Sequence, residues 1–123
     1  MKILLVDDSR TMRTIERKIL AGLGFMDVVE VADGQEALTA LGQNRFDLVL
    51  MDWNMPNLSG IEALKQIKAN SATKAIPVIM VTSESEKSHI LEAIKSGAAN
   101  YIIKPFTAEV IQEKLEAYLK KSQ

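Results

Sequence analysis

Residues that could do chemistry follow directly on four short apolar runs of this sequence. In chain order they are Asp7, Asp8, Asp52, Thr82 and Lys104. A lone Asp after a strand is more often a turn former or a helix cap, so none of them means much by itself. If the runs are parallel strands of one sheet, three carboxylates, a hydroxyl and an ammonium would converge on one edge of that sheet.

Three carboxylates in one partly buried cleft would repel one another unless a cation or protons relieved the repulsion. The chain has no cysteine and a single histidine, His89, so the ligands of such a site would be oxygen atoms. An all-oxygen site favours a hard ion, and Mg²⁺ fits best because it keeps bound water and shares phosphate oxygens. Asp7, Asp8 and Asp52 therefore predict a magnesium site.

Lys104 indicates what else the site would hold. An ammonium directed toward metal-bound carboxylates makes chemical sense if a phosphoryl group lies between them, its oxygens shared by the cation, Lys104 and the Thr82 hydroxyl. A carboxylate can accept a phosphoryl group and form an acyl phosphate. Asp52 is central among these partners, so we expect it to be the nucleophile.

Five short runs rich in β-branched residues are predicted to be the strands that position these groups. They span residues 3–6, 28–31, 48–51, 78–81 and 101–103. The first, third and fourth are nearly continuous rather than alternating, which is typical of strands covered on both faces. Helical segments separate the strands, and five of each predict a doubly wound α/β domain, since parallel neighbours need crossover connections.

The expected helices have recognisable ends and apolar faces. We expect helix caps at Asp8 or Ser9, Asp33, Ser59 and Thr107, and helix ends at Gly24 and Gly97. Apolar residues at helical spacing are expected to pack in the core; they include Met12, Ile15, Ile19 and Leu23 in the first helix and Ile90, Leu91 and Ile94 in the fourth. The same interpretation applies to Phe46, Met51 and Met80.

Length and composition bound the possible functions. The 123 residues, 47% hydrophobic and 25% charged, have the size and composition of one domain over residues 1–123, with no output domain. A net charge of -1 provides no basic field for nucleic acid or an anionic membrane. The absence of cysteine excludes disulfides and thiolate metal sites, and no apolar stretch is long enough to span a bilayer. We expect a soluble, cytoplasmic protein.

Over its whole length, this sequence resembles the receiver domain of two-component response regulators. The residues that carry the resemblance lie at the ends of the expected strands, and they are the acidic pair Asp7-Asp8, Asp52, Thr82 and Lys104-Pro105. A narrower resemblance is to the single-domain chemotaxis branch of this family. It rests on Asp52-Trp53-Asn54-Met55-Pro56-Asn57, Tyr101 and Lys104-Pro105-Phe106-Thr107. The resemblance implies a flavodoxin-like fold with strand order 2-1-3-4-5. It also implies that Asp52 takes a phosphoryl group from a sensor histidine kinase of the chemotaxis type.

The resemblance also assigns roles within the site. It implies that Asp8, Asp52 and the carbonyl of Asn54 ligate Mg²⁺, and that Asp7 acts through water. Lys104 and Thr82 hold phosphoryl oxygens, and the Lys104–Pro105 bond is implied to be cis. Residues around the phosphate are Asn54, Ser83 and Glu84, with Asn54 and Glu84 flanking the water that hydrolyses it. Ser9 and Ser83 depart from the common pattern of the branch, which leaves phosphate lifetime and donor preference open.

Thr82 and Tyr101 resemble the switch pair of the family, in which movement of the hydroxyl toward phosphate lets the aromatic ring turn inward. The surface read by a partner would then change, and its candidate residues are Lys87, Ile90, Tyr101, Ile103, Phe106 and Lys114. The implied target is a protein such as the flagellar motor switch, with a phosphatase as a further partner. The protein is expected to be a monomer that catalyses only its own phosphorylation and dephosphorylation.

Three alternatives stay open at the level of sequence. An intermediate receiver of a phosphorelay would share all these residues. A Mg²⁺-dependent phosphatase with an aspartyl nucleophile would usually carry a second Asp where this chain has Asn54. A flavin-binding module would need a phosphate-binding loop where Asp7 and Asp8 lie. Trp53 is expected to be a packing or a surface residue rather than a cofactor-stacking one, and His89 is expected to lie on the surface.

Overall fold

The computed structural model of this chain describes residues 1–83, 87–104 and 106–121, apart from the side chains of residues 87 and 118–121. Within that part of the chain five strands alternate with five helices. The strands are β1 (Lys2–Val6), β2 (Asp27–Val31), β3 (Leu48–Asp52), β4 (Val78–Thr82) and β5 (Asn100–Ile103). The helices are α1 (Arg10–Gly22), α2 (Gly34–Gln43), α3 (Gly60–Ala69), α4 (Lys87–Lys95) and α5 (Ala108–Lys121).

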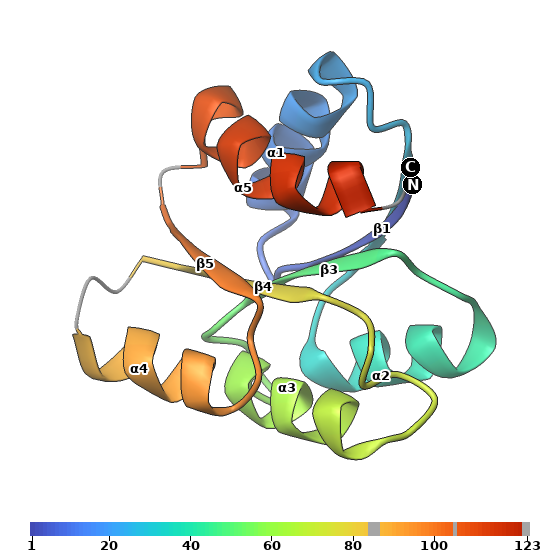
Figure 1. Ribbon diagram of the computed structural model, residues 1–123, viewed down its shortest axis with the longest axis vertical. Coiled ribbons are helices and arrows are strands. Elements are labelled where there is room, and N and C mark those ends of the chain that lie inside the picture. Colours follow the sequence, from blue (N-terminus) through green and yellow to red (C-terminus); the bar gives the residue numbers. More distant parts are fainter. Residues whose placement is uncertain (84–86, 105, 122–123) are drawn as a thin grey trace.

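The strands form one parallel sheet in the order β2-β1-β3-β4-β5, which confirms the predicted fold class and strand order. Helices α1 and α5 cover one face of the sheet, and α2, α3 and α4 cover the other (Figure 1). The chain adds β2 on one side of β1 and β3 on the other. The carboxyl ends of β1 and β3 therefore flank the point where strand order reverses, which is where open α/β sheets bind ligands.

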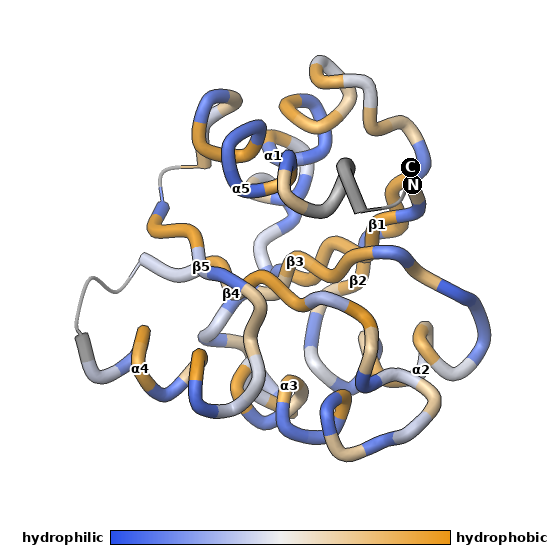
Figure 2. The backbone as a smooth tube through the Cα atoms, in the orientation of Figure 1, coloured by the Kyte–Doolittle hydropathy of each residue, from blue (hydrophilic) through white to orange (hydrophobic). Residues whose placement is uncertain are grey.

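Both faces of the sheet are buried, which explains the unbroken apolar runs of the central strands. Residues Leu4, Val6, Val49, Met51 and Met80 pack under α2, α3 and α4 in one cluster. The intervening residues Ile3, Leu5, Leu48, Leu50 and Ile79 pack under α1 and α5 in a second cluster. Figure 2 shows these strands as the continuous hydrophobic centre of the molecule. The sheet is thus a rigid support for the loops at its carboxyl edge.

The helix ends confirm the capping prediction. Side chains that accept a backbone N–H at the start of a helix are Ser9, Asp33, Ser59 and Thr107. Gly24 and Gly97 follow α1 and α4 with φ of 96° and 104°, a left-handed conformation that glycine adopts without strain. No helix in the described ranges is both long and apolar enough to cross a bilayer.

Two predicted apolar faces are only partly covered. In α1, Ile19 and Leu23 pack against the core as predicted. Ile15, however, is 45% exposed, whereas Glu16 is 1% exposed and Leu20 is fully buried. In α4, Leu91 and Ile94 are 54% and 47% exposed. Residue spacing indicates an amphipathic helix, but the contact with the sheet decides which flank of its apolar stripe is covered.

Candidate functional site

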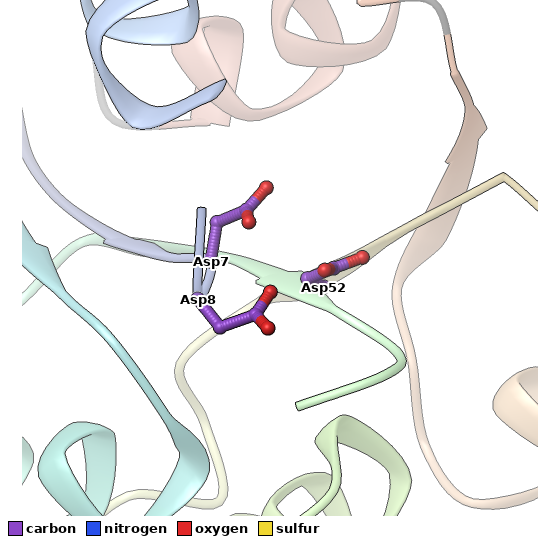
Figure 3. A group of neighbouring side chains, drawn as sticks. All are labelled: Asp7, Asp8 and Asp52. Atoms are coloured by element: carbon purple, nitrogen blue, oxygen red, sulfur yellow. The ribbon is translucent and has the colours of Figure 1, made fainter. Parts of the chain in front are cut away.

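Three carboxylates meet at the carboxyl edge of β1 and β3. Asp7 and Asp8 follow β1 directly, and Asp52 is the last residue of β3. The two strands are hydrogen-bonded neighbours, with Val6 opposite Met51. One carboxylate oxygen from each of the three lies within 4.8 Å of the others, and Figure 3 shows the side chains turned toward a common space. Asp7 and Asp52 are buried and Asp8 is exposed, so the cluster opens to solvent on the Asp8 side.

Lys104 reaches this cluster from the end of β5. Its Nζ lies 3.2 Å from Asp7 Oδ2 and 3.5 Å from Asp52 Oδ1. The backbone N–H of Lys104 donates to the carbonyl of Thr82 at 2.8 Å, which fixes where the side chain starts. Because β4 separates β5 from β3, only a long side chain can span this distance. The structure therefore brings Asp7, Asp52 and Lys104 into direct contact.

Asp7 is held in place by its neighbours along α1. The backbone N–H of Ser9 donates to Asp7 Oδ1 at 2.9 Å. Arg13 Nη1 donates to the Asp7 carbonyl at 2.6 Å, while Arg13 Nε bonds Glu30 Oε1 at 3.2 Å. These contacts join the end of β1 to α1 and β2. The orientation of the Asp7 carboxylate is thus set before any ligand arrives.

The turn after Asp52 is tightly built. The Trp53 N–H donates to Asp52 Oδ1 at 3.0 Å and to the Val81 carbonyl at 3.2 Å. Gly60 donates its N–H to the Trp53 carbonyl at 2.9 Å. A Cβ atom on Gly60 would lie 2.0 Å from the Asp52 carbonyl oxygen, so the start of α3 must carry glycine to pass this close to the strand end.

Burial and charge shift the pKa values of the central pair. Burial raises the pKa of Asp52 to about 6, with the Asp7 charge adding to the rise and the Lys104 ammonium opposing it. Burial alone would lower the pKa of Lys104, but the negative charges of Asp52 and Asp7 outweigh it and raise that pKa. Asp52 is therefore largely ionised at neutral pH and close to its ammonium partner.

Glu16 is a site residue that sequence reasoning missed. It lies on the inner face of α1, is 1% exposed, and its Oε1 has no hydrogen-bond partner in the described part of the structure. Burial, then the charge of Asp7, raises the pKa of Glu16 to about 8. Its position one helical turn after Met12 and one before Leu20 was the available signal, because that spacing places it on the apolar face.

Other predicted residues end β4 or follow β3 and β4 in the chain. Thr82 ends β4 and is 3% exposed, whereas Asn54 and Ser83 are exposed in the loops after β3 and β4. Glu84, which we expected beside the phosphate, lies outside the described residues, as does Pro105 with its predicted cis bond.

The predicted partner face is only partly exposed. Ile103 is 38% exposed, and Ile90 and Tyr101 are half-buried. Lys114 Nζ lies 5.0 Å from the centroid of the Tyr101 ring. The side chain of Lys87, a further predicted member, lies outside the described residues.

One member of that face needs correction. Phe106 is 5% exposed and packs with Ile111 and Leu115 in the core under α1 and α5, so its side chain is not presented to a partner. Burial of its ring against two core residues of α5 explains the difference.

The expectation for His89 is also wrong. His89 is half-buried on α4, and its ring stacks on Trp53 with 4.6 Å between centroids and 5° between planes. Trp53 is 8% exposed, so of the two expected possibilities it is a packing residue.

The donor set suits a hard divalent cation. The acidic cluster supplies carboxylate oxygens, one of them on an exposed residue, and excess negative charge that Lys104 balances only in part. Oxygen donors at an edge open to water are what Mg²⁺ requires, because it keeps several of its own waters. The residues present therefore fit this ion.

Comparison with known proteins shows the family of this chain. The chain belongs to the response regulator receiver domain family, whose model matches residues 3–116. It is 46% identical to the chemotaxis protein CheY of Pseudomonas aeruginosa over 116 residues, which cover 94% of each chain. It is 47% identical to CheY-3 of Vibrio cholerae, covering 94% of this chain and 89% of that one. The predicted resemblance to this family is confirmed.

Solved structures show the same architecture. CheY4 of Vibrio cholerae superposes with a TM-score of 0.86 and 34% identity, covering 95% of this chain and 97% of that one. The receiver domain of the sensor histidine kinase PA1611 of Pseudomonas aeruginosa has a TM-score of 0.88 and 30% identity over 97% of each chain, and its structure contains a magnesium ion in the active-site cleft.

Proposed function

We propose that this protein is a phosphorylation-activated signalling switch that takes a phosphoryl group from a sensor histidine kinase on Asp52, with Mg²⁺ as cofactor. The observation that carries the proposal is the meeting of Asp7, Asp8 and Asp52 with the Lys104 ammonium at one edge of the sheet. Membership of the receiver family and the relation to chemotaxis proteins support it.

The transfer step follows from the chemistry of a carboxylate nucleophile. A carboxylate oxygen of Asp52 attacks the phosphorus of a phosphohistidine, the P–N bond breaks, and the imidazole leaves with the bonding electron pair and takes up a proton. Lys104 stabilises negative charge on the phosphoryl oxygens, and the Thr82 hydroxyl holds another of them. The product is an acyl phosphate on Asp52.

Mg²⁺ would be held by Asp8, Asp52 and the carbonyl of Asn54, with Asp7 acting through water. When bound, this ion neutralises charge on the carboxylates and on the incoming phosphoryl group. The magnesium ion in the PA1611 receiver domain supports this assignment, because that chain shares the fold at 30% identity. The buried Asp7, fixed by Ser9 and Arg13, would keep its carboxylate facing the ion.

The phosphoryl group would leave by hydrolysis at the same site. Water attacks the phosphorus on the face opposite Asp52, the P–O bond to the carboxylate breaks, and inorganic phosphate is released. Asn54, Ser83 and Glu84 would border the path of this water. The protein would catalyse these two reactions on itself and act on no separate substrate.

The output would pass through Thr82 and Tyr101 to a protein target. A phosphoryl group favours the state in which Thr82 turns toward it and Tyr101 moves inward, and this shifts the population of the two states. The similarity to chemotaxis proteins supports the flagellar motor switch as that target and a chemotaxis kinase as the donor. The face around Ile90, Ile103 and Lys114 would contact the target, and the protein would act as a monomer.

The decisive experiment measures phosphorylation directly. The protein is incubated with Mg²⁺ and a small acyl phosphate, weighed intact by mass spectrometry, and compared with Asp52→Asn. We expect one labile phosphate that requires Mg²⁺ and is absent from the variant, with a change in Trp53 emission in the wild type. A label that persists in Asp52→Asn would reject Asp52 as the acceptor, and onward transfer to a second histidine domain would favour a phosphorelay over a motor target.

A further inference from the structure

The stack between Trp53 and His89 joins the phosphoacceptor to α4. Trp53 follows Asp52 in the chain and donates its N–H to Asp52 Oδ1 at 3.0 Å. Its ring lies parallel to the His89 ring, at 5° and a centroid distance of 4.6 Å. A single residue therefore contacts the reacting carboxylate with its backbone and α4 with its side chain.

The backbone of Trp53 has little freedom to absorb a change at Asp52. Its N–H is shared with the Val81 carbonyl in β4 at 3.2 Å, and its carbonyl accepts from Gly60 at the start of α3 at 2.9 Å. The ring is 8% exposed and packs in the cluster that includes Ala93 of α4. A change in the bonds at Asp52 Oδ1 therefore acts on a residue whose ring packs against α4.

Helix α4 has few other anchors. Of the side chains described in this helix, Ala93 alone is fully buried, and it is the small residue one turn after His89 on the same face. Leu91 and Ile94 point to solvent. His89 is half-buried, and its Nδ1 is inaccessible to solvent with no hydrogen-bond partner among the described residues. Among the described residues, its ring contacts Trp53 by stacking.

We propose that His89 is a positioning residue that couples the state of Asp52 to α4 through its stack on Trp53, by a route separate from Thr82 and Tyr101. The inference rests on the proposed phosphorylation of Asp52. When Asp52 Oδ1 carries a phosphoryl group or a metal ion, its bond from the Trp53 N–H weakens, the ring shifts, and the position of α4 follows. A truncated side chain at residue 89 would disconnect the helix from the site.

The test measures amide hydrogen exchange of residues 88–95 in the full chain, with and without Mg²⁺ and beryllofluoride, a stable mimic of the phosphoryl group. Calorimetry of the same samples measures binding of these ions independently of any helix. The variants are His89→Ala, His89→Phe, which keeps an aromatic ring for the stack, and Leu91→Ala, an exposed control on the same helix.

In the wild type we expect the ions to change exchange in α4 by between about twofold and tenfold, the range allowed by a ring pair worth roughly 0.5–1.5 kcal/mol. In His89→Ala the ion-dependent change in exchange should be less than about half of the wild-type change, and the affinity for the ions should be retained. His89→Phe should restore the change, and Leu91→Ala should behave as the wild type does.

The outcomes separate the two proposals. An undiminished change in His89→Ala that binds the ions normally would overturn the coupling and leave the proposed function intact. A loss in His89→Ala that His89→Phe does not restore would also overturn it, because the ring would then not be the cause. Absence of ion binding in the wild type would overturn the proposed function, and the coupling with it.

Discussion

Lys104 Nζ lies 3.5 Å from Asp52 Oδ1, although a whole strand, β4, lies between β3, which ends at Asp52, and β5, which ends just before Lys104. The lysine therefore forms an internal counter-ion for the residue proposed to accept phosphate. In this position it offsets the negative charge at the site and can also contact the phosphoryl oxygens. Both roles make separate and measurable predictions.

Replacement of Lys104 with Met should slow phosphorylation by a small acyl phosphate by at least about 100-fold, the usual cost of losing one donor to the transition state. Binding of Mg²⁺ at pH 8 should be retained or strengthened, since a competing cation is gone. Lys65→Met, an exposed change on α3, is the control. Equal losses of metal binding and phosphorylation would show that Lys104 only supports the fold of the site.

Asp8→Asn should weaken Mg²⁺ binding by at least about tenfold, because the charge of the ligand set controls affinity for hard cations. Asp8 is exposed, so the fold should be preserved. Without metal, the variant should unfold at the same temperature as the wild type or at a higher one, because the repulsion among the three carboxylates decreases. Asp27→Asn, at the opposite end of the sheet, should bind as the wild type does. Unchanged affinity in Asp8→Asn would exclude this carboxylate as a ligand.

The affinity for Mg²⁺ should depend on pH through Asp52. With the pKa of this carboxyl at about 6, protons compete with the ion below that pH, and affinity should fall by about tenfold per pH unit. Above about pH 7 this carboxylate should contribute no further change. Calorimetric titrations between pH 5 and pH 8 measure how the Mg²⁺ affinity varies with pH. An affinity that stays constant from pH 5 to pH 7 would contradict the assignment of Asp52 as a ligand of the ion.

Glu16→Gln should stabilise the protein at neutral and alkaline pH. The pKa of Glu16 rises from 4.5 to about 8 on folding, so the folded state holds this proton more tightly than the unfolded state. Its contribution to stability is fully present below pH 4.5 and is lost as pH rises through about 8.

At pH 8 the free energy of unfolding of Glu16→Gln should exceed that of the wild type by more than about 1 kcal/mol, and the two should converge near pH 4. Urea unfolding at both values measures this, with the exposed Glu113→Gln as control. A stability difference that does not vary with pH would show that Glu16 is not titrating in this range.

Gly60→Ala should destabilise the protein by at least about 2 kcal/mol, since its Cβ would overlap the carbonyl oxygen of Asp52. The shift of the strand end should also weaken Mg²⁺ binding. Gly42→Ala in α2 meets no atom within 4 Å and should stabilise by up to about 1 kcal/mol. A tolerated alanine at residue 60 would mean that the turn after Asp52 relaxes more easily than its contacts suggest.

Much of the fold and of the carboxylate cluster could be predicted from the sequence. The strands are buried on both faces, so their apolar runs are unbroken and easily recognised. Parallel strands must end at a common edge, which places Asp7, Asp52 and Lys104 together once the strand order is known. The N-caps could be predicted because Asp33 and Ser59 bond their own helix locally.

Contacts between elements could not be predicted in the same way. The sequence pattern of α1 does not indicate which flank of its apolar stripe meets the sheet, so the burial of Glu16 was not predicted. Phe106 and His89 were assigned to the surface because nothing local shows that one joins the α5 core and the other stacks on Trp53. Each of these residues is placed by a neighbour distant in sequence, and residue spacing carries no information about such neighbours.

Lys104 and Asp7 meet although they are 97 positions apart in the chain. A polypeptide emerging from the ribosome would present its first acidic pair long before the residues of β5 had been synthesised. Under the proposed function, the chain would be able to accept a phosphoryl group only after the sheet is complete. Phosphorylation by a small donor could therefore serve as a readout of correct folding during synthesis.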